Sequence, residues 1–142
     1  MSKKSAKIAE LIEGCQGQGR DAHYLGYFEC FNEQLFYEAH DVLEELWLGQ
    51  RDGPNYGFYK GLIQFAGAFV HLQKNRLRPA GALFKLSRKY LAPYPEIHEG
   101  LDLRRVRAMI DEWAGQLERK DFSENPLTPE RIPRLKLNEL RQ

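Results

Sequence analysis

The sequence has little of what marks disulfide-stabilised, secreted or membrane-spanning proteins. Its 142 residues include two cysteines, Cys15 and Cys30, which are too few for a disulfide framework or a zinc knot and are expected to be reduced thiols. No apolar run approaches the roughly 20 residues that span a bilayer. The N-terminal stretch is amphipathic rather than a signal peptide. We therefore expect a cytoplasmic protein with no membrane partner.

The chain also lacks a large net charge. With 21 Lys and Arg against 20 Asp and Glu, the formal charge is +1, so no overall field favours nucleic acid as a partner. The charges are unevenly placed, because residues 22–48 hold six acidic side chains and no Lys or Arg, whereas residues 74–107 hold nine basic and three acidic ones. We expect these segments to complement each other within the fold or across a homo-oligomer.

Motifs of the common enzyme classes are missing as well. The sequence contains no nucleophile elbow, no Walker-type phosphate loop and no Cys-His pair with sequence context, so it gives no independent support for catalysis. No segment alternates apolar and polar residues with enough β-branched side chains for a strand. An enzyme and a β-sheet are both disfavoured.

Helical periodicity is the strongest pattern that the sequence does contain. Hydrophobic residues make up 42% of the chain and charged residues 29%, a composition typical of one folded domain. Pro79 stands where a first-turn proline belongs, and Asp102 can cap the last helix. Apolar residues recur at helical spacing over 8–15, 24–31, 35–48, 56–75, from Pro79 to just before Pro93, and from Asp102 to about Leu117.

These patterns predict an all-α, single-domain bundle of five to six helices around a central antiparallel helix hairpin, formed by residues 35–48 and 56–75. Residues 1–20 are expected to form an N-terminal helix and a glycine-rich link, and residues 21–119 the helical core domain. Residues 120–142, which contain Pro126, Pro129 and Pro133, are expected to form an extended tail. This tail is predicted to lie on the surface or to reach a neighbour.

The most unusual pattern is a row of polar residues on this hairpin, which we call the polar row. At about 100° per residue, His40, Glu44 and Trp47 lie within roughly 40° of one another on one helix. On the other helix, which is otherwise apolar, Gln64 and His71 share a face in the same way. Since a buried polar group without a hydrogen bond costs about 1–3 kcal/mol, the two helices are expected to face each other and to satisfy these groups mutually.

The same residues resemble a known family, the domain of unknown function 309 family of small bacterial and archaeal helical proteins. The resemblance covers roughly Phe28 to Leu91. It rests on an acid-x-His-acid-x-x-Glu-x-x-Trp segment, a Gly-Leu-Ile-Gln segment, a later His and a small pair, which are here Glu38, His40, Asp41, Glu44, Trp47, Gly61-Leu62-Ile63-Gln64, His71 and Gly81-Ala82. Asp41 stands where Glu is more usual. The resemblance implies an all-helical fold and no known activity.

Three interpretations of the polar row stay open. The first and preferred one is structural: an uncharacterised small helical protein in which a buried hydrogen-bonded row stabilises the fold, with Trp47 as a core residue. The second is a metal- or small-ligand-binding site, in which His40, Glu44 and His71 hold a divalent metal ion and Glu38, Asp41, Trp47 and Gln64 are further ligand candidates. The third is a helical protein-protein interaction module.

Spacing argues partly against one metal site that uses both helices. His71 lies seven residues after Gln64, which separates the two by roughly 10 Å along the helix axis. Tyr37 occupies the position where a di-iron Glu-x-x-His motif would need its glutamate. For the interaction module, the exposed basic residues are expected to include Arg104, Arg105 and Arg107. His23 and His98 carry no further pattern and are expected at the surface.

Overall fold

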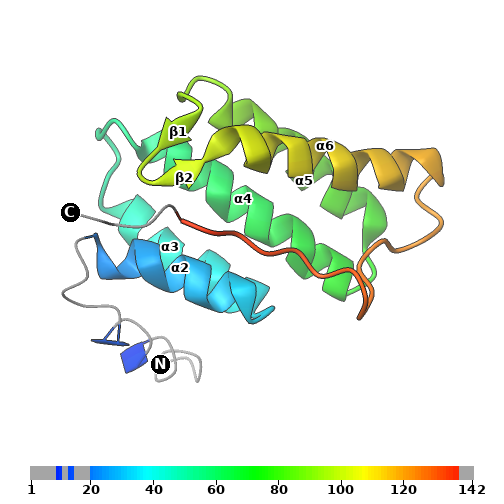
Figure 1. Ribbon diagram of the computed structural model, residues 1–142, viewed down its shortest axis with the longest axis horizontal. Helices are drawn as coiled ribbons and strands as arrows, with labels where there is room; N and C mark the ends of the chain where they lie inside the picture. Colours follow the sequence, from blue (N-terminus) through cyan, green and yellow to red (C-terminus); the bar gives the residue numbers. More distant parts are fainter. Residues whose placement is uncertain (1–8, 11–12, 15–19, 138–142) are drawn as a thin grey trace.

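The computed structural model describes residues 9–10, 13–14 and 20–137. In this part of the chain five α-helices form a bundle (Figure 1), which confirms the predicted all-α class. They are α2 (Ala22–Asn32), α3 (Phe36–Leu48), α4 (Tyr56–Gln73), α5 (Leu77–Leu91) and α6 (Leu103–Arg119). Most of the helix predicted over residues 8–15, and the glycine-rich link after it, lie outside the described residues. None of the described helices is long and apolar enough to cross a membrane.

The helix ends follow the capping residues of the sequence. The Asp21 carboxylate accepts hydrogen bonds from the backbone N–H groups of His23 (2.7 Å) and Tyr24 (3.4 Å) at the start of α2. Asp102 accepts from the backbone N–H of Arg105 (3.3 Å), so the predicted cap of α6 is confirmed. These side chains satisfy N–H groups that have no partner within the first helical turn.

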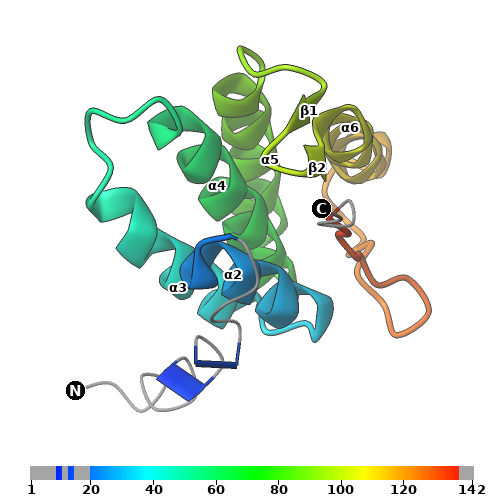
Figure 2. The ribbon, with the colours of Figure 1, turned by 60° about the vertical axis from the view of Figure 1, so that its left-hand side comes forward.

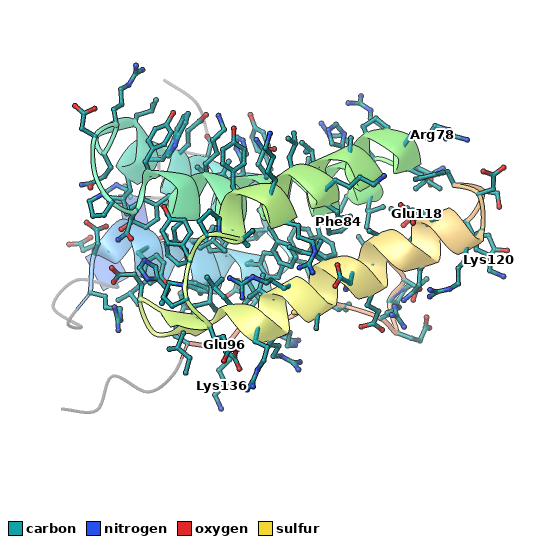
Figure 3. The ribbon with its side chains drawn as sticks, turned by 90° about the horizontal axis from the view of Figure 1, so that it is seen from above. Arg78, Phe84, Glu96, Glu118, Lys120 and Lys136 are labelled. Carbon is teal, nitrogen blue, oxygen red and sulfur yellow. The ribbon has the colours of Figure 1, made fainter. Side chains whose placement is uncertain are left out.

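Each helix packs against the next one along the chain, and α4 lies between α3 and α5 (Figure 2). The ring of Phe69, a residue of α4, contacts rings from three other helices. The centroid distances are 5.6 Å to Phe31 of α2, 5.2 Å to Phe84 of α5 and 5.0 Å to Trp113 of α6. Phe84 lies in the space between α5 and α6 (Figure 3). Of the described helices, α4 contributes the largest number of buried residues, and aromatic side chains from its neighbours meet on it.

A small antiparallel hairpin, β1 (Ile97–His98) and β2 (Leu101–Asp102), precedes α6. The prediction of no sheet is therefore wrong in this detail. Glu99 and Gly100 form the turn with φ of 50° and 74°, and positive φ at both positions gives a turn that fits the twist of a hairpin. The sequence did not reveal it because strands of two residues are too short to show alternation.

The hairpin turn is tied to the bundle by the side chain of Glu99. Its carboxylate accepts from Arg20 (2.9 Å) and from the Asn55 amide (2.8 Å), while its backbone oxygen accepts from the Tyr24 hydroxyl (2.8 Å). Burial raises the pKa of Tyr24 well above its ordinary value, so this hydroxyl stays a donor. The turn is thus held by three residues that are distant from it in the sequence.

Two predicted surface residues are instead part of the packing. His98 is half-buried, its Nε2 lies 2.6 Å from Asn55 Oδ1, and its ring packs against Phe58 (centroids 4.7 Å apart). Arg107 is also half-buried and donates to the backbone oxygens of Leu91 (3.0 Å) and Tyr94 (2.6 Å). Both predictions are wrong, because partners far along the chain satisfy these polar groups. Arg104 and Arg105 are exposed as expected.

The segment after α6 runs between α2 and α6 across the bundle (Figure 1). Asn32 of α2 donates to the backbone oxygen of Leu135 (2.7 Å) and accepts from its N–H (2.8 Å). The Asn125 amide donates to the backbone oxygen of Leu72 (2.6 Å). With Leu135 itself buried, the described part of the tail, residues 120–137, lies on the bundle surface, one of its two predicted placements. Its separation as a unit of its own stays a prediction.

Candidate functional site

A groove of about 290 Å³ opens where α3, α4 and α5 meet. All five residues of the polar row line it, whereas the further ligand candidates Glu38 and Asp41 are not among the lining residues. The groove is lined by Tyr37, His40, Glu44 and Trp47 of α3, by Lys60, Ile63, Gln64, Gly67, Val70 and His71 of α4, and by Leu83 of α5. The structure therefore brings the two halves of the polar row to one surface, as their spacing predicts.

The periodicity of α3 explains why its polar residues reach the groove. The other face of this helix buries Phe36, Ala39, Val42 and Leu43 in the core, and the polar row follows at helical spacing on the remaining face. On α4, Gly67 lets α5 come close, because a Cβ there would lie 3.0 Å from Leu83. The groove is therefore a consequence of how three helices pack.

Three side chains of α3 form a group that could hold a metal ion. Atoms of His40, Asp41 and Glu44 that can bind metal all lie within 4.8 Å of one another, and each residue is half-buried. His40 Nδ1 is 3.4 Å from Asp41 Oδ1. His71 does not belong to this group, so the structure joins two of the three predicted metal ligands with Asp41 instead.

The polar row does not form the expected mutual hydrogen bonds. In the described residues no hydrogen bond joins His40, Glu44 or Trp47 to Gln64 or His71. Instead, His40 Nδ1, Trp47 Nε1 and His71 Nδ1 are buried atoms without a hydrogen-bond partner, and Arg20 Nε is the one other such side-chain atom in this part of the chain. Since each unpaired group costs about 1–3 kcal/mol, most of this cost falls on the groove.

The ammonium group of Lys60, the lysine that lines the groove, makes cation–π contacts with two aromatic rings. Lys60 Nζ lies 4.8 Å from the ring centroid of Trp47 and 5.4 Å from that of Tyr90. The Trp47 ring packs against Tyr56 (5.1 Å), and Tyr37 stacks on His40 (6.2 Å). The groove thus has a cationic end at Trp47 and a carboxylate-bearing middle at Glu44.

Burial lowers the pKa of His71, and the charges of Arg76 and Lys74 lower it further. The unfolded state then binds a proton more readily than the folded state, so the free energy of unfolding falls as the pH drops through the unfolded value of about 6.5. We expect the ring C–H shifts of His71 to titrate with a midpoint below 6.5 in an NMR experiment. We also expect His71→Gln to flatten the loss of stability between pH 7 and pH 5. A midpoint at or above 6.5 would contradict this prediction.

Sequence reasoning missed several of the residues that shape the groove, among them Lys60 and Leu83. Lys60 lies four positions before Gln64, on the same face of α4, so its place in the groove could have been predicted from the helical spacing. Leu83 comes from α5, and no spacing within the hairpin could have placed it there. The residues within one helix were thus predictable, and the contribution of a third helix was not.

The fold and the groove define an all-helical domain with a polar and aromatic groove between three consecutive helices. The sequence model of the family described as domain of unknown function (DUF309) matches residues 24–83, the stretch from α2 into α5 that builds the groove. This match confirms the resemblance inferred from the polar row.

A relative in Aquifex aeolicus (strain VF5) bears the name "Uncharacterized protein". This chain is 28% identical to it over 119 residues, which make up 83% of this chain and 35% of the relative. The chain thus spans about a third of the relative's length. No solved structure matches the chain.

Proposed function

We propose that the groove is a ligand-binding site that holds a divalent metal ion on His40, Asp41 and Glu44. The observation that carries this proposal is the approach of their three ligand atoms to within 4.8 Å of one another, on a turn of α3 whose His40 and Glu44 line the groove. Ligand atoms bound at about 2.1 Å to one ion lie at most about 4.2 Å apart, so small side-chain rotations bring them to bonding distance.

The donor set favours particular metals. One imidazole nitrogen and two carboxylate oxygens suit Mn²⁺, Fe²⁺ or Zn²⁺ better than metals that prefer thiolates. The two carboxylates also balance the charge of a divalent ion. Because all three ligands come from one turn of α3, they occupy one side of the ion. Its other positions are open to water or to a ligand in the groove, which is how catalytic and substrate-binding metal sites differ from structural ones.

A purely structural polar row accounts less well for the geometry. A row that stabilises the fold by hydrogen bonds has its donors and acceptors paired with each other. Here the atoms His40 Nδ1, Trp47 Nε1 and His71 Nδ1 have no hydrogen-bond partner beside an open groove. This pattern supports a site whose groups are completed by something that binds there.

The proposal is tested by calorimetric titration of Mn²⁺ and Zn²⁺ into the purified chain after treatment with a chelator. We expect saturable binding of one ion per chain. Elemental analysis of protein purified without added metal checks which ion it carries. If neither Mn²⁺ nor Zn²⁺ binds saturably, the proposed function is wrong.

A further inference from the structure

The cation at the Trp47 end of the groove has no anionic partner in the described part of the chain. Lys60 makes no ion pair there, and its ammonium group lies between the rings of Trp47 and Tyr90, 4.8 Å and 5.4 Å from their centroids. Contacts of this kind hold a cation in place without neutralising it. Lys60 is thus a fixed positive charge that borders the groove.

A second donor without an acceptor belongs to the same place. The indole Nε1 of Trp47 is buried and has no hydrogen-bond partner, and an indole nitrogen can only donate. Lys60 also offers only donors. Because the ammonium group lies on the Trp47 ring itself, the two donors are neighbours. Together they lack an acceptor, and a negatively charged oxygen group satisfies both.

The rest of the groove sets the shape of the ligand. Ile63, Val70 and Leu83 give it apolar walls, and its volume is about 290 Å³. This is near the lower end of the roughly 300–1,000 Å³ of small-molecule sites. The space therefore suits a small molecule with an apolar body and one charged head.

We propose that the groove binds a small amphipathic oxyanion, a carboxylate or a phosphate monoester. Its head accepts hydrogen bonds from Lys60 and from the indole N–H of Trp47, and its apolar body lies against Ile63, Val70 and Leu83. This inference rests on the proposed function in one respect: a metal ion on His40, Asp41 and Glu44 offsets the repulsion between the Glu44 carboxylate and the bound anion.

The test compares a carboxylate with its neutral isostere, and a phosphate monoester is added as the second anionic head group. Hexanoate, its neutral isostere hexanamide and monohexyl phosphate are titrated into Zn²⁺-loaded and chelator-treated protein by calorimetry. We expect at least one of the two anions to bind at least tenfold more tightly than hexanamide, and the tighter of the two identifies the head group. Equal affinity for the anions and the amide in both forms of the protein would overturn the inference without any variant.

Two variants test the assigned donors. Lys60→Gln should weaken binding of the preferred anion at least tenfold while leaving hexanamide unaffected, and Trp47→Phe, which keeps a ring but removes the N–H, should weaken it in the same direction. Lys85→Gln is the matched control, because Lys85 is 72% exposed on α5 and pairs with Glu118. Anion binding that is unchanged in Lys60→Gln would overturn the assignment.

The two proposals fail in different ways. If Zn²⁺ binds but neither anion is preferred over hexanamide, the oxyanion inference fails and the metal site stands. If a Lys60-dependent anion binds and no metal does, the inference stands and the proposed metal function fails. Zn²⁺ titration of Lys60→Gln should still show one bound ion, which confirms that this variant keeps its fold and its metal site.

Discussion

Replacing Phe69 with alanine is expected to lower the free energy of unfolding by about 3–5 kcal/mol. Phe69 is fully buried, and its ring meets Phe36 of α3 as well as rings from α2, α5 and α6, with centroids 5.0 to 5.6 Å away. Its removal leaves a cavity where these helices meet, and rings held by several helices cannot close it without moving them. Urea denaturation of the two proteins measures the difference.

Ile97→Ala is the control for this experiment. Ile97 is 60% exposed, so its truncation should change the free energy of unfolding by about 0.5 kcal/mol or less. Small domains have a free energy of unfolding of about 5–15 kcal/mol, so the loss expected for Phe69→Ala is a large part of the total. Phe69→Leu, with a smaller loss in the same direction, is measured beside it. A loss below about 1 kcal/mol for Phe69→Ala would show that α4 is not the centre of the core.

Glu44→Gln is expected to weaken the binding of Zn²⁺ and Mn²⁺ by at least ~10–100-fold. Losing even a residue that only orients a metal ligand typically has an effect of this size, and Glu44 is proposed to bind the ion directly. The amide keeps the size of the side chain but removes the charge that balances the cation. Calorimetric titration of the variant and the parent protein measures the change.

Glu45→Gln is the matched control on the same helix. The Glu45 carboxylate pairs with His23 (3.1 Å) and its side chain is 60% exposed, outside the groove. Metal affinity should therefore be unchanged in Glu45→Gln, and thermal unfolding should show that both variants keep their fold. If Glu44→Gln and Glu45→Gln weaken metal binding equally, the ion is attracted by the overall negative charge of α3 and is not coordinated by Glu44.

The helices of the core were predictable because the sequence patterns that specify a helix lie within the helix itself. The expected segments 35–48 and 56–75 became α3 (Phe36–Leu48) and α4 (Tyr56–Gln73), since apolar periodicity is set by residues a few positions apart along the chain. The hairpin before α6 was missed for the opposite reason. Its strands are too short for a pattern, and Glu99 is fixed by Arg20 and Asn55, which no local rule connects to it.

The sequence by itself determined which side chains share a face of each helix, and so it identified His40, Glu44, Trp47, Gln64 and His71. Only the tertiary structure decided what these faces do together. It placed Asp41 rather than His71 beside His40 and Glu44, brought Leu83 in from α5, and left a groove where mutual hydrogen bonds were expected. The physical reason is that the helical repeat fixes angles around one axis. The spacing between axes is set instead by the side chains that pack on the other faces, such as Phe69 and its ring partners.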